Sequence, residues 1–184
     1  MTNVLQEQNV WYLDTEGVVT ANPVYIRKIV LIPNAAADAA TFTCWGPQSS
    51  EPTVRTTMIG KTVTTSLTTT ITSTGNFEAT TEALANDIIE ITKTSTANNL
   101  GSWQIGTRSS DDAIIVDVGN SALSNDTGAT YDWKVWKPAP VFKMVSPGTE
   151  KVAIQLDFGE KGFRFPNLAM HTLSTSAVLY VYVL

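Results

Sequence analysis

The segment that decides the fold is Lys61-Thr-Val-Thr-Thr-Ser-Leu-Thr-Thr-Thr-Ile-Thr-Ser73. Its apolar residues Val63, Leu67 and Ile71 are four positions apart, a spacing that fits one helix face or alternate strand positions. Seven of the thirteen residues are Thr, and crowded β-branched side chains lose rotamer freedom in a helix. The segment is therefore predicted to be a strand.

The same bias extends over the whole chain. Thr contributes 27 and Ser 13 of the 184 residues, whereas charged residues make up 16%, against about 25% in an average soluble domain. Thr favours strands over helices. A surface made polar by hydroxyl groups rather than by charges is typical of an extracellular or assembled β protein.

Short alternating runs bounded by Gly, Pro, Asn and Asp recur along the chain, which indicates an all-β fold. The clearest run is Lys151–Phe158, with Val152, Ile154, Leu156 and Phe158 expected to point inward. A short helix is expected only at residues 78–85. Further strands are expected at residues 24–32, 41–45, 88–92, 103–107, 113–118, 131–136, 141–145, 163–172 and 178–184.

Charge is spread unevenly along the sequence. Residues 1–77 carry four basic and five acidic groups, residues 78–132 carry two and nine, and residues 133–164 carry six and three. The change from acidic to basic composition falls close to residues 119–129, a stretch rich in Gly, Ser, Asn and Asp that is typical of a linker. This coincidence indicates a boundary between domains.

We therefore predict a jelly-roll-like antiparallel sandwich formed by residues 1–53 and 121–184. A small, acidic, barrel-like β module, residues 54–120, is predicted to be inserted into it. An inserted domain needs two exposed linkers, which the segments near Glu51 and Gly119 can supply. The alternative is one sandwich of 184 residues with an acidic edge.

Composition also excludes several classes of function. The net charge of −5 and pI of about 4.8 give no electrostatic basis for binding nucleic acid. One His and one Cys cannot form a Cys/His zinc site, and no cofactor is expected. No apolar run approaches the roughly 18 residues of a membrane span, and residues 1–13 do not resemble a signal peptide.

Several single residues could form functional sites, but a purely structural role is the simpler interpretation of each. His171 has no neighbouring His or Cys in the sequence, so a packed or surface imidazole is expected. Cys44 is expected to be a small buried hydrophobe. Asp111, Asp112 and Asp117 lack the spacing of a calcium loop, so a polar turn is expected.

Two regions are candidates for contact with a partner. The N-terminal segment carries Val4, Leu5, Val10, Trp11 and Tyr12 with little charge and precedes the first predicted strand, residues 24–32. Free in water it would expose apolar surface, so it is expected to become ordered only on a partner.

The second region is the edge at Trp136 and Lys137. Strand alternation places Trp136 on the face that carries Lys134, and an exposed Trp between lysines is typical of a protein contact. The alternatives are plain packing in the core or at its rim, and stacking on carbohydrate or nucleic acid.

The last strand, residues 178–184, is apolar on both faces, so either two layers or a neighbouring subunit must cover it.

Two parts of the sequence resemble known proteins. The outer frame comprises Val24-Tyr-Ile-Arg-Lys-Ile-Val-Leu-Ile-Pro-Asn-Ala-Ala-Ala-Asp-Ala-Ala-Thr-Phe42, Phe163-Arg-Phe-Pro-Asn-Leu168 and Ala177-Val-Leu-Tyr-Val-Tyr-Val-Leu184. It resembles small β-sandwich virion proteins of tailed bacteriophages. The inner piece, from Asn86-Asp-Ile-Ile-Glu-Ile-Thr92 to Asp112-Ala-Ile-Ile-Val116, resembles a short β-barrel repeat of phage head and tail proteins.

The resemblance implies a non-enzymatic structural protein, a decoration or cement protein on the capsid exterior. It implies the major capsid protein as a partner and self-association into a homo-oligomer, with a trimer expected. The alternative is a head-fibre or tail-fibre module that binds a receptor or glycan. A hydrolase with paired carboxylates is the weakest hypothesis, because no feature of the sequence distinguishes one Asp/Glu pair from another as catalytic.

Overall fold

The computed structural model describes residues 4–6, 9–46, 53–77, 83–95, 99–117 and 122–184. Within these residues the chain forms β-strands and no helix, so the predicted all-β fold is confirmed. Accordingly, the described residues include no helix able to cross a membrane. The strands are β1 (Val4–Gln6), β2 (Val10–Leu13), β3 (Gly17–Thr20), β4 (Val24–Ile32), β5 (Ala39–Cys44), β6 (Thr53–Ser66), β7 (Thr70–Thr72), β8 (Ile88–Thr94), β9 (Gly101–Ser110), β10 (Ala113–Asp117), β11 (Asp126–Lys137), β12 (Ala139–Val145), β13 (Ile154–Asp157), β14 (Phe163–Phe165), β15 (Leu168–Leu173) and β16 (Val178–Val183).

The chain divides into two compact units, and each has a hydrophobic core of its own. The first unit consists of Met1–Cys44 together with Pro140–Leu184, and the second is Trp45–Ala139. The first is a sandwich of two sheets and the second is a closed barrel.

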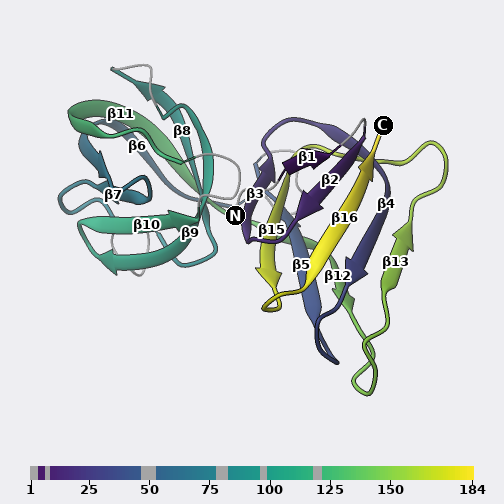
Figure 1. The fold of residues 1–184 in the computed structure, drawn as a ribbon. Helices are drawn as coiled ribbons and strands as arrows, with labels where there is room; N and C mark the ends of the chain where they lie inside the picture. The colour runs from purple at the N-terminus through teal and green to yellow at the C-terminus, as the bar shows by residue number, and fades with distance from the viewer. Residues whose placement is uncertain (1–3, 7–8, 47–52, 78–82, 96–98, 118–121) are drawn as a thin grey trace. The chain divides into compact units, whose positions relative to one another are not determined.

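In the sandwich, one sheet has the order β1-β2-β16-β4-β13, with β14 also paired to β4, and the other has the order β12-β5-β15-β3 (Figure 1). Strand β16 alternates between buried and more exposed residues along its length, and β4 does so except at Arg27 and Lys28, because successive side chains point to opposite faces of a sheet. Ile29, Leu179 and Val181 from one sheet and Phe42 and Met170 from the other belong to the same core cluster. The clearest predicted strand is shorter than expected: β13 begins at Ile154, and Val152 is exposed.

The second unit is a six-stranded barrel in the order β10-β7-β6-β11-β8-β9. Its interior is filled by apolar and aromatic side chains, with Trp133 stacked on Phe77 at 5.7 Å between ring centroids. Near one end, the Tyr131 hydroxyl donates to Asp126 Oδ2 at 2.6 Å and accepts from Asn99 Nδ2 at 2.8 Å. This polar network attaches the segment before β9 to the start of β11.

The limits of the inserted unit differ from the predicted 54–120. β11 pairs with β6 from Asp126↔Thr65 to Lys137↔Thr53, and it pairs with β8 on its other side. Residues 126–137 are therefore barrel wall, and the predicted linker at 119–129 runs into a strand. The barrel unit carries six basic and ten acidic residues and the sandwich unit six and seven, so the steep charge break does not lie at the boundary.

The insertion occupies the connection between two neighbouring strands of the sandwich. β5 and β12 lie side by side, and Ser146 N donates to Asp38 O at 2.8 Å at the far end of the pair. Because the strands run in opposite directions from that point, Cys44 and Ala139 lie at the same end. The insertion therefore replaces a hairpin loop.

The Thr-rich segment that indicates the fold contains a turn as well as strands. β6 ends at Ser66 and β7 begins at Thr70, with Leu67 and Thr68 at positive φ. Neither residue is a typical turn residue, since positive φ is costly for side chains other than Gly and Asn. Of the expected helix, residues 78–82 lie outside the described residues, and residues 83–85 are not helical.

Excising residues 45–139 and joining Cys44 to Pro140 through a short Gly/Ser linker is expected to leave a folded sandwich. The physical reason is that both cuts lie at one end of adjacent strands and the sandwich core draws no residue from the barrel. A strand-type circular dichroism spectrum and a cooperative melt would agree with this expectation. An insoluble product, or one that melts without cooperativity, would contradict it.

An ion pair joins Arg55 and Asp87 in the barrel, and the Asp87 side chain is only 4% exposed. Burial raises the pKa of Asp87, and this effect outweighs the opposing effect of Arg55. Arg55→Met removes the neutralising charge from a buried carboxylate, so we expect a loss of about 3 kcal/mol in unfolding free energy at pH 7. Chemical denaturation of the full chain measures this loss.

A pKa that is higher in the folded state makes protonation favour folding. The loss in Arg55→Met should therefore shrink as pH falls through the folded pKa of Asp87. The matched control is Arg108→Met, which breaks the Arg108–Asp111 pair at 2.6 Å, in which the acidic side chain is 66% exposed. This variant should cost under about 1 kcal/mol. Equal losses of unfolding free energy in the two variants would contradict the expectation that breaking the buried pair costs more.

Candidate interaction surface on the sandwich

The outer face of the first sandwich sheet carries a band of half-buried aromatic and apolar side chains. On β16, Leu179, Val181 and Val183 are buried, whereas the alternating residues between them are half-buried and point away from the core. Equivalent positions on β2 and β4 extend the band. We call it the tyrosine face, and it consists of Val10, Tyr12, Lys28, Val30, Val178, Tyr180 and Tyr182.

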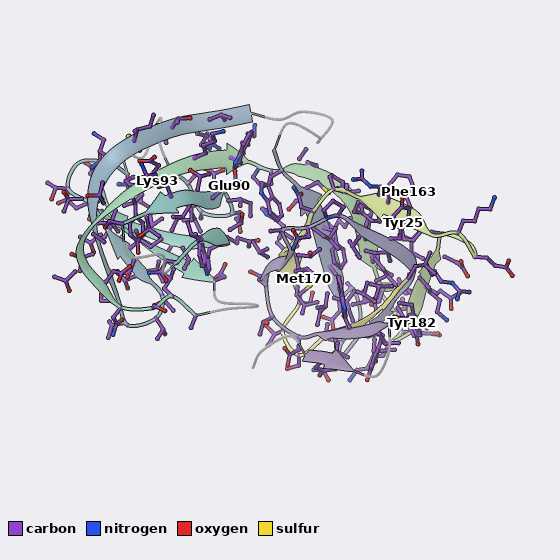
Figure 2. All side chains as sticks on the ribbon, turned by 90° about the horizontal axis from the view of Figure 1, so that it is seen from above. Tyr25, Glu90, Lys93, Phe163, Met170 and Tyr182 are labelled. Carbon is purple, nitrogen blue, oxygen red and sulfur yellow. The ribbon has the colours of Figure 1, made fainter. Side chains whose placement is uncertain are left out.

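Two cross-strand rows form the centre of this face. In one row, Tyr12 lies opposite Tyr180, with the rings edge to face at 5.6 Å between centroids. In the next row, Lys28 Nζ lies 4.5 Å from the centroid of the Tyr182 ring, a cation–π contact. Figure 2 shows Tyr182 on the sandwich unit. Burial, and after it the charge of Asp14, raises the pKa of Tyr12.

A β-bulge places two cations beside each other at the end of this face. Tyr182 pairs with Lys28, but the next pair is Val183 with Ile26, so Arg27 has no partner on β16. The extra residue brings Arg27 and Lys28 to the same outer face, while Ile26 and Ile29 on either side are buried. Bulges commonly redirect side chains in this way at functional sites.

An open pocket of about 350 Å³ lies at the bulge. It combines cationic, acidic, aromatic and aliphatic side chains from four elements of the sandwich. Asp157 on β13 pairs with Lys28 on β4, and its carboxylate accepts a hydrogen bond from Gly159 N at 2.7 Å. The pocket is lined by Asn9, Val10, Arg27, Lys28, Asp157, Tyr182, Val183 and Leu184.

The structure changes the interpretation of the N-terminal segment. β1 and β2 are strands of the chain's own sheet, with Val4 paired to Tyr12 and Leu5 paired to Trp11, so the expectation of an arm without a local core is wrong. Trp11 packs against the sandwich core and Val10 and Tyr12 face outward. The side chains of Val4 and Leu5 lie outside the described residues.

The second predicted contact region is also corrected. Trp136 is 5% exposed rather than solvent-facing, and its Nε1 donates to Glu90 Oε2 at 2.8 Å. Trp136 does lie on the face of Lys134, as alternation predicts, because Lys134 Nζ lies 5.7 Å from the centroid of its ring and the barrel core contains Val135 but not Trp136. The Trp136 side chain is nevertheless buried on that face. Lys137 is exposed at the strand end, so this edge presents a lysine without the exposed Trp.

The remaining candidate residues fit their simpler interpretations. Cys44 is buried, as predicted, and its thiol donates to Asn167 O at 2.8 Å. Asp111 pairs with Arg108, and Asp112 Oδ1 accepts from Gly75 N at 2.6 Å, as expected for a polar turn. His171 is half-buried on β15. The described residues contain no group of three or more His, Cys, Asp or Glu placed to hold a metal ion.

Sequence reasoning noted that the last strand is apolar on both faces but did not find the site that this creates. The missing information was the pairing of β16 between β2 and β4, which gathers three tyrosines on one face. The bulge at Arg27 leaves no local signal in the sequence. Comparison with protein-family models, curated proteins and solved structures gives no match.

The buried thiol of Cys44 provides a test of the sandwich core. Burial raises the pKa of Cys44 to about 11, and the thiolate is the reactive form. At pH 8 the folded chain should therefore react with a disulfide reagent at least about tenfold more slowly than the urea-unfolded chain. Absorbance of the released thiol measures both rates; equal rates would contradict a closed core around β5.

Proposed function

We propose that the chain is a non-enzymatic virion structural protein, a decoration or cement protein on the exterior of a phage capsid. The observation that carries the proposal is the tyrosine face, a half-buried aromatic and apolar sheet surface on a chain in which charged residues make up only 16%. Tyr side chains combine large apolar area with a polar tip, and they are enriched where proteins bind one another.

The face has the properties of the centre of an interface. Tyr12, Tyr180 and the valines beside them are fixed by the sheet, so burying them against a partner costs little side-chain entropy. The partners proposed are the major capsid protein and further copies of the chain, with a trimer as the assembled form. Many symmetric copies would stabilise a shell by avidity, because each contact adds to the others.

The edge of the same sheet supports assembly in a second way. β1 is the terminal strand, bonded on one side to β2. An edge strand offers backbone donors and acceptors for pairing with another chain. A partner that covers the tyrosine face can therefore also bind along this edge.

Tyr12→Ser and Tyr180→Ser in the full chain test the proposal. Each removes an aromatic ring from the centre of the face, and we expect each to weaken binding by about 2 kcal/mol, or about 30-fold. Light scattering gives the oligomer mass, and electron microscopy gives the occupancy on capsids of the source particle.

The control is Ile59→Ser, since Ile59 is an apolar barrel residue that is 73% exposed. It should leave mass and occupancy unchanged. Full occupancy by both tyrosine variants would rule out the face as the working contact.

A further inference from the structure

The pocket at the bulge holds two cations, Arg27 and Lys28, for which no ion pair is found among the described residues. Arg27 is exposed and Lys28 is half-buried, and the ion pairs found in the described residues are formed by other side chains. Asp157, on the neighbouring strand, directs one carboxylate oxygen to Gly159 N. Adjacent like charges repel each other, so an anion placed between Arg27 and Lys28 would be bound favourably.

The position of the pocket limits the kind of ligand. A peptide commonly binds a sheet by pairing with a free strand edge. Here strands β16 and β4, which carry most of the lining residues, each have hydrogen-bonded neighbours on both sides, and only β13, which carries Asp157, is a terminal strand of the sheet. Over β16 and β4, recognition therefore comes from side chains, which suits a compact ligand.

The other lining groups favour a ligand with ring faces as well as charge. The Tyr182 ring forms part of the floor, and Val10 and Leu184 add apolar surface around it. Pyranose rings present C–H faces to aromatic rings and hydroxyl groups to polar side chains such as Asn9 and Asp157. A volume of about 350 Å³ lies at the small end of ligand pockets, about 300–1,000 Å³, which suits one or two sugar rings.

We propose that this pocket binds an acidic saccharide, with the ligand's carboxylate between Arg27 and Lys28 and a sugar ring against Tyr182. The site goes beyond the proposed capsid function, because it requires neither capsid nor oligomer. It also uses residues that the capsid test leaves unchanged, so the two proposals can fail separately.

The test is titration of the purified full chain with 3′-sialyllactose, observed by calorimetry and by ligand-detected NMR. Lactose is the neutral comparison and hexaglutamate the acidic peptide comparison. We expect sialyllactose to bind at least about tenfold more tightly than either, and its affinity to fall as salt is raised.

Variants connect the binding to the bulge. Lys28→Met and Arg27→Met should each weaken sialyllactose binding about tenfold or more, and Lys28→Arg should retain it. Arg164→Met is the matched control, because Arg164 is an exposed cation on β14 that does not line the pocket. Thermal melts of all four variants verify that the sandwich is folded.

Three results would overturn the proposal. They are no binding of sialyllactose, equal binding of lactose, and tighter binding of hexaglutamate. Equal weakening by Arg164→Met and Lys28→Met would also overturn it, because the effect would then be general surface charge. If Lys28→Met alone unfolds the sandwich, the comparison of Arg27→Met with Arg164→Met decides the outcome.

Discussion

The pairing of β6 with β11 is the constraint on which the rest of the structure depends. These strands are the first and last of the inserted unit, and their register runs from Asp126↔Thr65 to Lys137↔Thr53. The pairing closes the barrel, and it also brings the two ends of the inserted chain together. The sandwich can then keep β5 beside β12 as though a short hairpin joined them. The entropic cost of so long a connection grows slowly with its length, by about 0.6 kcal/mol per doubling.

Local alternation in the sequence was enough to predict most strands, because a strand with one face on a core shows its period of two directly. Residues 24–32 were predicted as a strand, and β4 has those bounds. The pairing of strands that are far apart in the sequence produces no such local pattern. β11 was divided between a linker and a strand because its first residues, Asp126 to Gly128, have turn composition, yet they extend the ladder against β6. Charge was equally misleading, since Lys134 and Lys137 belong to the acidic unit.

Irregularities in the ladders explain why the candidate site was only partly predictable. Strict alternation correctly places Trp136 on the face of Lys134, but it does not reveal that the side chain is buried there. Strict alternation would place Arg27 and Lys28 on opposite faces, but a bulge brings them together. Where the strands are regular, as around Tyr12 and Tyr180, the apolar composition of the N-terminal segment and of the last strand did indicate the surface. Bulges depend on how a strand fits its neighbours, so a single strand's sequence does not reveal them.

The arrangement of the two rows on the tyrosine face connects the two proposals. The row of Tyr12 and Tyr180 and the row of Tyr182 and Lys28 are two residues apart along the same strands, a distance of about 7 Å. A protein partner seated on the first row would therefore reach the rim of the pocket in the second. If both proposals hold, the partner and the saccharide must influence each other's affinity by the same factor, because coupling between two binding sites is reciprocal. A partner that stops short of Tyr182 would leave the pocket open, and one that covers Tyr182 would make assembly and saccharide binding mutually exclusive.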